Sequence, residues 1–340
     1  MAGSCRSGAT TSGGAAGLAG LDMGIGCNKW GTKAGKFDGD ALEATYVTAL
    51  DLGVRLFNTA QVYPTSEACI GDLRSRTGRR ESFVVSKFNS LGKAPAQLVE
   101  SLRASLRDLR MAKVDGFLVH FPKGDLRALA AALAEAVDAG LVDHVGCSNF
   151  GETALRELHG LLKARNVPLA FNEIEFSLLR RRPETDGLLA CCAELGVTVL
   201  AWAPLASGRL AGGHRADVTN PRSAPVLRAL DVVSEKCGRT PAQVAINWCI
   251  CKGVVPIPGA RTKAQAEELC GAKNFRLSRT EVVALDSCAL DSAGFYDDPE
   301  ALLCFLGIKP PRSLRPLVVA FLKCALRLAT ALTPLQRDLR

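Results

Sequence analysis

Residues 114–147, VDGFLVHFPKGDLRALAAALAEAVDAGLVDHVGC, carry the pattern that decides the fold. An apolar run at Val114–Phe121 precedes a helical pattern at Leu126–Ala139, and Gly140 and a second apolar run at Val142–Cys147 follow it. Apolar residues spaced by three and four indicate a helix with one buried face, whereas consecutive apolar residues indicate a strand buried on both faces. Glycine is frequent just past helix ends. The stretch therefore predicts a strand, a helix and a second strand parallel to the first.

The same unit recurs along the chain, with helices also predicted at Gln97–Leu109 and at Pro183–Leu195, the latter before Gly196. Eight such units are typical of a (β/α)8 TIM barrel, an α/β fold with eight parallel strands. An open doubly wound sheet is the alternative, but it favours a GxGxxG turn, and no predicted strand precedes one. The predicted strands are Leu21–Gly26, Val54–Thr59, Phe83–Phe88, Val114–Phe121, Val142–Cys147, Leu169–Ile174, Val197–Ala203 and Val254–Ile257.

The pattern divides the 340 residues into three parts: a leader at 1–21, the barrel at 22–290 and an extension at 291–340. The leader is rich in Ala, Gly, Ser and Thr and has no acidic residue before Asp22, which predicts disorder or a remnant of an organelle-targeting segment. The extension contains an amphipathic basic pattern between Pro316 and Pro334. Packing on the barrel, peripheral membrane contact and contact with a partner protein are the three readings of this helix.

Composition limits which classes of partner and which cellular compartments are expected for this chain. The net charge of +8 is a mild excess without a basic stripe interleaved with aromatic residues, which argues against nucleic acid. The 13 cysteines form no CxxC pair and no zinc-ligand spacing, so no metal site is expected. Scattered in apolar runs, they indicate reduced thiols and a reducing compartment, the cytoplasm or alternatively a plastid or other organelle. No feature of the sequence specifies an oligomeric state.

Polar residues lie where predicted strands end. Asn58 ends the second strand and leads to Tyr63, Lys87 lies at the end of the third, and His120 at the end of the fourth. In a TIM barrel the chemistry is located at these carboxyl ends. Taken singly, each residue also has a structural reading: a packing tyrosine, a solvated lysine, or a hydrogen-bonded core histidine. Together they predict one polar site at the mouth of the barrel.

The residues around these positions resemble the aldo-keto reductase superfamily, as found in plants, algae and bacteria, in the order of its motifs. The resemblance spans about residues 22–290 and implies a (β/α)8 barrel that reduces aldehydes or ketones with a nicotinamide cofactor. It is carried by Gly24–Gly31, Phe57–Tyr63, Ser66–Gly71, Val84–Lys87, Phe117–His120, Val145–Phe150, Asn172–Ser177, Ala201–Gly208 and Pro256–Arg261.

The resemblance implies a division of labour in the site. Tyr63 would give a proton to the carbonyl oxygen, and His120 would orient the carbonyl by a hydrogen bond. A phenol has an ordinary pKa near 10, and a neighbouring Lys87 ammonium would lower it by stabilising the phenolate. Asn58 departs from the family, which usually places an aspartate there, paired with the lysine. The sequence thus predicts that Lys87 lacks an ionic partner, that turnover is weakened, and that Asn58→Asp raises it.

The resemblance also implies an NADP site, with NADPH preferred to NADH. Trp202 would stack on nicotinamide, and Ser148 and Asn149 would bind its carboxamide, although a core tryptophan and a helix cap are the alternatives. Glu173 replaces a usual glutamine. Arg261 at a helix start suits a 2′-phosphate, and Leu269 replaces the family's asparagine in the adenosine clamp. The remaining cofactor residues implied are Gly26, Pro204, Leu205, Ser207, Gly208, Gly259, Gln265 and Glu268.

The substrate would be a hydrophobic or aromatic carbonyl, since the candidate wall is apolar. Its predicted members are Trp30, Phe88, Phe121 and Phe150, and core packing is an equal interpretation of each Phe. The alternative function is that of an NADP(H)-binding, redox-sensing subunit with little turnover, similar to the channel β-subunit branch of the superfamily. Asn58, Glu173 and the extension favour this alternative.

Overall fold

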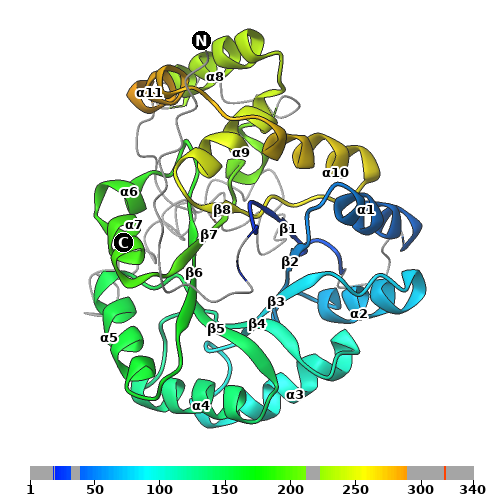
Figure 1. Cartoon of the computed structure of the whole chain (residues 1–340), viewed down its shortest axis with the longest axis vertical. Coiled ribbons are helices and arrows are strands. Elements are labelled where there is room, and N and C mark those ends of the chain that lie inside the picture. The colour runs from blue at the N-terminus through cyan, green and yellow to red at the C-terminus, as the bar shows by residue number, and fades with distance from the viewer. Residues whose placement is uncertain (1–17, 19, 32–38, 212–222, 289–317, 319–340) are drawn as a thin grey trace, which may run out of the picture.

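The structure, a computed structural model, describes residues 18, 20–31, 39–211, 223–288 and 318. Eight parallel strands, hydrogen-bonded in chain order, form the centre of the molecule (Figure 1). This confirms the predicted TIM barrel and its eight strands. The strands are β1 (Gly24–Gly26), β2 (Leu56–Asn58), β3 (Phe83–Phe88), β4 (Val114–Val119), β5 (Val142–Ser148), β6 (Leu169–Glu175), β7 (Thr198–Trp202) and β8 (Val255–Pro256).

The barrel closes between its first strand and the segment that follows its last. The Gly26 N–H donates to the Pro258 carbonyl at 2.9 Å, and Gly26 forms a parallel bridge with Gly259. A Cβ atom at Gly26 would lie 2.9 Å from the Ile257 carbonyl oxygen, closer than such atoms pack. Glycine at this position therefore permits the close approach that completes the barrel.

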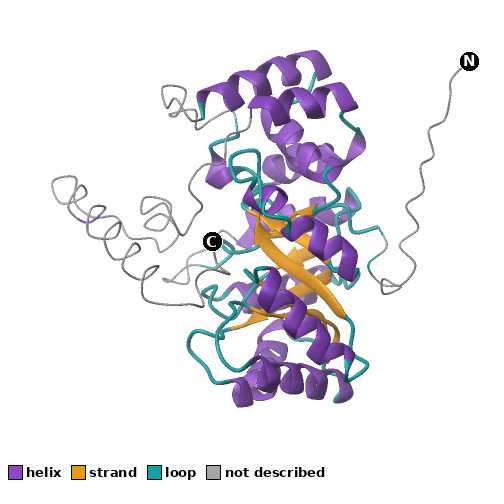
Figure 2. Ribbon diagram, turned by 90° about the vertical axis from the view of Figure 1, so that its left-hand side faces the viewer, coloured by secondary structure: helices purple, strands orange, loops and turns teal. Residues whose placement is uncertain are grey.

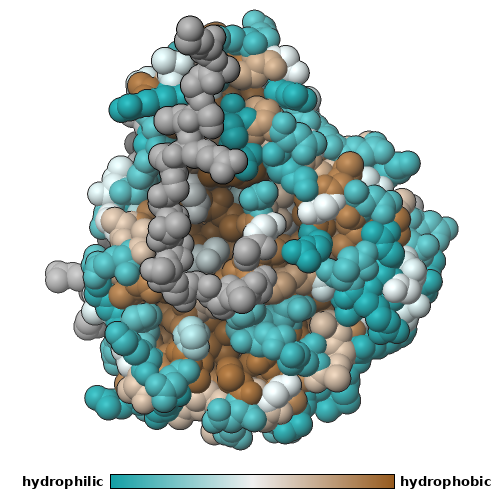
Figure 3. Space-filling view, in the orientation of Figure 1, coloured by the Kyte–Doolittle hydropathy of each residue, from teal (hydrophilic) through white to brown (hydrophobic). Residues whose placement is uncertain are grey.

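Helices surround the strands, as Figures 1 and 2 show. They are α1 (Gly39–Asp51), α2 (Ser66–Thr77), α3 (Leu98–Leu109), α4 (Leu126–Asp138), α5 (Glu152–Lys163), α6 (Arg182–Thr185), α7 (Leu188–Leu195), α8 (Ala224–Cys237), α9 (Pro241–Cys251), α10 (Lys263–Cys270) and α11 (Arg279–Cys288), with short 3-10 turns at Pro95–Gln97, Ala206–Gly208 and Gly271–Asn274. On the face in Figure 3, hydrophilic residues dominate the periphery over the helices, and apolar residues show near the centre.

The predicted helix at Pro183–Leu195 is wrong in one respect. The chain forms two helices there, α6 and α7, separated at Asp186 and Gly187. Gly187 has φ of +88°, a left-handed conformation that breaks a right-handed helix. The other glycines named as helix ends behave as expected, with φ of +66° at Gly140 and +69° at Gly196. The apolar spacing alone did not reveal the break.

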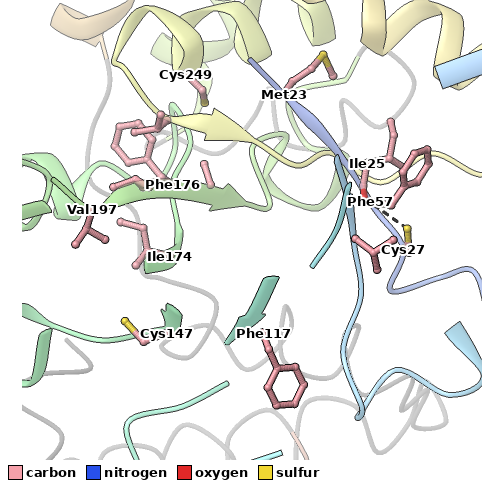
Figure 4. Close-up of a cluster of buried hydrophobic side chains, with 14 of the residues drawn as sticks. Met23, Ile25, Cys27, Phe57, Phe117, Cys147, Ile174, Phe176, Val197 and Cys249 are labelled. Carbon is pink, nitrogen blue, oxygen red and sulfur yellow. Dashed lines mark hydrogen bonds between the residues drawn. The ribbon is translucent and has the colours of Figure 1, made fainter. Parts of the chain in front are cut away.

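The core has two layers, because successive side chains of a strand point to opposite faces. Val85 and Leu118 belong to the apolar cluster inside the barrel. Val84, Phe88 and Phe117 belong to a larger cluster between strands and helices, part of which is drawn in Figure 4. On β3 this alternation puts Lys87 on the same side as Val85 and Phe88 on the other.

The predicted leader and C-terminal extension fall almost wholly outside the described residues, and so does the amphipathic basic helix. Residues 1–17, 19, 289–317 and 319–340 are not described. Among the helices that are described, none is both long enough and apolar enough to cross a membrane.

Candidate active site

A cavity of about 310 Å³ opens at the carboxyl ends of the strands, a size within the range of small-molecule sites. It brings together residues that are far apart in the sequence, as expected for the functional end of a TIM barrel. Its lining is Gly26, Cys27, Asn28, Lys29, Asn58, Tyr63, His120, Ser148, Asn149, Glu173, Trp202, Ala203, Ser207, Ile257 and Gly259.

The predicted proton donor and orienting residue, Tyr63 and His120, line this cavity, and the predicted cation, Lys87, is buried beside Tyr63. The rings of Tyr63 and His120 lie edge to face with centroids 6.0 Å apart. The Lys87 Nζ atom lies 5.2 Å from the centre of the Tyr63 ring. Tyr63 is half-buried, whereas Lys87 has no exposed surface. The arrangement puts a positive charge beside a phenol that opens onto the cavity.

Lys87 has an ionic partner, contrary to the expectation from Asn58. Its Nζ atom lies 3.2 Å from Glu173 Oε1, and it donates hydrogen bonds to Asn58 Oδ1 at 2.7 Å and to the Thr59 carbonyl at 2.9 Å. Asn58 Nδ2 donates to Glu173 Oε2 at 2.7 Å. Burial lowers the pKa of Lys87, and the Glu173 carboxylate acts in the opposite direction. Sequence reasoning missed the hydrogen bond between Asn58 and Glu173 because 115 residues separate them.

The turn that carries Tyr63 is tied to the neighbouring strands by buried hydroxyl groups. The Thr59 hydroxyl donates to Ser66 Oγ, and the Ser66 hydroxyl donates to the Cys27 carbonyl, both at 2.8 Å. Glu67 accepts a hydrogen bond from the Ser86 hydroxyl at 2.5 Å, and burial raises its pKa. The Ser66-Glu67 motif therefore fixes the start of α2, and with it the turn, against β1 and β3.

His120 is expected to stay neutral across the physiological pH range. It is 5% exposed and stacks on Phe121 with centroids 4.5 Å apart, and burial, followed by the charge of Lys87, lowers its pKa well below the usual value. Below about pH 6.5 the imidazole of His120 takes up a proton in the unfolded chain, whereas in the folded chain it stays neutral. The contribution of His120 to stability should therefore decline below that pH. In an NMR titration, the His120 ring signals should not move between about pH 8 and 6. A midpoint near 6.5 would contradict this.

Ser148 and Asn149 form one network with Trp202 and the backbone of β6. The Ser148 hydroxyl donates to the Glu173 carbonyl at 3.0 Å, Asn149 Nδ2 donates to the His120 carbonyl at 3.1 Å, and Trp202 Nε1 donates to Asn149 Oδ1 at 3.1 Å. The N-cap of α5 is Gly151, so the helix-cap alternative for Ser148 and Asn149 is wrong. Trp202 is half-buried: it packs against the apolar cluster inside the barrel and also lines the cavity.

A second cavity of about 380 Å³ continues from the first and shares Gly26, Lys29, Ala203, Ser207, Ile257 and Gly259 with it. The loop after β7 forms part of its wall in a strained conformation, with φ of +50° at Ala203, +48° at Ala206 and +58° at Ser207. Such strain is concentrated at functional sites. The predicted cofactor residues in this wall are Gly26, Pro204, Leu205, Ser207, Gly208, Gly259, Arg261, Gln265 and Glu268; Leu269 lies there as well.

Arg261 lines the second cavity and lies just before Thr262, the N-cap of α10. Its backbone N–H donates to Gln265 Oε1 at 2.8 Å, and its side chain is exposed. Thr262 caps α10 by accepting from the Gln265 N–H. A cation at a helix N-terminus is unfavourable by itself, because the helix dipole is positive there. The position becomes favourable once an anion is bound, so the part of the second cavity beside Arg261 suits a phosphate group.

None of the four predicted wall residues is among the residues that line the first cavity. Trp30, Phe88 and Phe150 have no exposed surface and pack in the cluster between strands and helices. Trp30 instead donates its indole N–H to the Ala260 carbonyl at 2.6 Å. Phe121 is half-buried beside His120. The packing interpretation therefore holds for Phe88 and Phe150, and Lys29, Ala203 and Ile257 are cavity residues that sequence reasoning missed.

Comparison with known proteins identifies the class. The fold is a TIM barrel, and a model of the aldo/keto reductase family, a family of oxidoreductases, matches residues 22–290. The chain belongs to the aldo/keto reductase family.

Several relatives are named for reductase activity. A chloroplastic pyridoxal reductase of Arabidopsis thaliana is 33% identical over 283 residues, which cover 74% of this chain and 78% of the relative. An NADP(+) aldo-keto reductase of Schizosaccharomyces pombe is 27% identical over 294 residues, 76% of this chain and 86% of the relative. A thermostable aldo-keto reductase crystallised with the inhibitor epalrestat superposes with a TM-score of 0.69 at 28% identity, covering 78% of this chain and 94% of its own.

Proposed function

We propose that this protein reduces an aldehyde or ketone to an alcohol with NADPH. The observation that carries the proposal is that Tyr63 and His120 line one cavity, with Lys87 buried beside Tyr63, and that Arg261 lines an adjoining second cavity. The NADP(+) in the name of the yeast relative supports the choice of cofactor. Trp202, Ser148 and Asn149 would hold the nicotinamide end, and Arg261 the 2′-phosphate end.

When bound, the reduced nicotinamide supplies a hydride to the carbonyl carbon. The residues of the chain bind the carbonyl oxygen and supply its proton. The neutral His120 ring holds the carbonyl oxygen by a hydrogen bond, and the Tyr63 hydroxyl gives that oxygen its proton. The Lys87 ammonium stabilises the phenolate left behind, which regains a proton from water. The buried Lys87 is kept in place by Asn58, Thr59 and Glu173.

The alternative, a redox-sensing subunit with little turnover, was favoured by the replacements at Asn58 and Glu173. The hydrogen bond between these two residues, and their joint contact with Lys87, make them compatible with turnover. We therefore favour the catalytic function over that of a redox-sensing subunit. The third argument for sensing, the extension, falls in the part of the chain that is not described.

A substrate screen tests the proposal. Purified protein is incubated with NADPH and a panel of aromatic and aliphatic carbonyls, including pyridoxal and methylglyoxal, which occur in the names of relatives. We expect consumption of NADPH with formation of an equal amount of alcohol for at least one of them. Tight NADPH binding without turnover on the whole panel would favour the sensing subunit instead.

The compartment is proposed separately. Reduced thiols indicate the cytoplasm, and the chloroplastic label of the Arabidopsis relative adds weight to a plastid. Subcellular fractionation of the source cells, with an antibody to the chain, would distinguish the two.

A further inference from the structure

The three buried groups around Lys87 form a closed set of contacts. Each polar end of the Asn58 amide is used, since its oxygen accepts from Lys87 and its nitrogen donates to Glu173. Each oxygen of the Glu173 carboxylate is also used, one by the Asn58 amide and one by Lys87. The exposed fractions are 2% for Asn58, 0% for Lys87 and 2% for Glu173. Water therefore has little access to replace any of these partners.

The charges of this set balance. Lys87 is a buried cation, and Glu173 is its only ion-pair partner within 4 Å in the part of the chain that the structure describes. A buried charge without a partner is strongly disfavoured, and two carboxylates in one site disfavour each other's ionised forms. The set thus accommodates one carboxylate and one amide. The family that the chain resembles usually has these two groups in the opposite places, aspartate at position 58 and glutamine at position 173.

We propose that Glu173 is the positioning residue that serves as counter-ion to Lys87, and that carboxylate and amide have been exchanged between β2 and β6. The glutamate side chain, which is longer than that of an aspartate, allows Glu173 on β6 to reach Lys87 on β3. Asn58 hydrogen-bonds with both residues. Glu173 acts through Lys87 and does not itself transfer a proton. This inference rests on the proposed function for its effect on turnover, but the charge balance is measurable without turnover.

A cycle of three variants tests the exchange: Asn58→Asp, Glu173→Gln and the double variant. Asn58→Asp, which the sequence alone predicts to raise turnover, replaces the donor that faces Glu173 with a second acceptor and a second negative charge, so the opposite effect is now expected. Glu173→Gln leaves the Lys87 ammonium without a counter-ion. Each single variant should lower kcat about ten-fold or more, since residues in one network couple strongly. The double variant again holds one carboxylate and one amide, so its kcat should return to within about three-fold of the wild type.

The pH dependence separates positioning from a merely structural role. Without Glu173 the Lys87 ammonium loses its proton at lower pH, so the alkaline fall of kcat should move to lower pH in Glu173→Gln and move back in the double variant. The Lys87 titration itself is followed by NMR of lysine labelled with nitrogen-15, with the signal assigned by its absence from Lys87→Met. It should show the same shift and the same return. Glu175→Gln, on the same strand but close to Arg180, is the matched control and should change neither.

The outcomes are distinct. If the wild type does not turn over pyridoxal or any other carbonyl of the panel but the Lys87 titration behaves as described, the proposed function fails and the counter-ion assignment stands. An unchanged Lys87 titration in Glu173→Gln overturns the assignment. So does an Asn58→Asp enzyme that is faster than the wild type. If Glu173→Gln does not fold, the comparison of Asn58→Asp with the double variant carries the test, and a double variant no better than the single one overturns the exchange.

Discussion

Replacing Tyr63 with Phe is expected to lower kcat by about a hundred-fold or more, the effect of removing a positioned general acid. The change deletes only the hydroxyl, so the half-buried ring keeps its contacts with His120 and Lys87. NADPH affinity should therefore remain close to that of the wild type. The measurement is steady-state kinetics with the best carbonyl of the panel, together with an NADPH titration by protein fluorescence.

Tyr46→Phe is the matched control for this prediction. Tyr46 is fully buried and lies away from the cavity lining. Its hydroxyl donates to the Arg79 carbonyl and also hydrogen-bonds with Ser82 Oγ, both at 3.0 Å. Its loss should reduce stability by about 0.5–1.5 kcal/mol, the net value of a hydrogen bond, and leave kcat nearly unchanged. Equal activity of Tyr63→Phe and wild type would remove Tyr63 from the role of proton donor.

Replacing Arg261 with Ala should weaken NADPH binding about ten- to hundred-fold and leave NADH binding nearly unchanged. A guanidinium can pair with two oxygens of a 2′-phosphate, which NADH lacks, and a charge-assisted hydrogen bond contributes about 1.5–3 kcal/mol. Arg261 lines the second cavity beside Gln265 and Glu268. Fluorescence titration of both cofactors measures the effect, with Trp202 in the wall of the first cavity as the expected reporter.

Lys263→Ala separates the specific effect from loss of nearby charge. Lys263 is the first residue of α10, its side chain is 65% exposed and lies 3.7 Å from Glu267, and it is not in the cavity lining. Its replacement should alter the affinity for either cofactor little. Equal weakening of both cofactors by Arg261→Ala would indicate general damage to the barrel mouth. No weakening of either would exclude Arg261 from the site.

The fold could be predicted from the sequence because each strand–helix unit is a local pattern. The eight apolar runs coincide with the eight strands, and helix ends were marked by glycines such as Gly140. The break at Gly187 was missed because an apolar spacing continues across it, and glycine inside a helical pattern has no single meaning. The conformation of a residue with positive φ depends on the surrounding packing as well as on its identity.

The gathering of Tyr63, Lys87 and His120 could be predicted from the sequence, but the residues of the cavity wall and the contacts of Lys87 could not. The motif order places Tyr63, Lys87 and His120 at strand ends, and the barrel then brings strand ends together. The pairing of Lys87 with Glu173 depends on side chains that reach across the barrel from β3 and β6, which no local pattern encodes. The packing of Phe88 could have been foreseen, since it follows an inward-facing Lys87 on the same strand and must face the helices.

The most direct test of carbonyl reduction is a transfer experiment with NADPH that carries deuterium at its transferable nicotinamide hydrogen. Protein and cofactor are mixed with pyridoxal or with the best carbonyl of the panel, and the alcohol is analysed by mass spectrometry. The account predicts deuterium on the former carbonyl carbon, in the same amount as NADP⁺ formed, and about a hundredth of that amount or less with Tyr63→Phe over the same time. An NADPH complex visible by fluorescence that yields no deuterated alcohol from any carbonyl would contradict it.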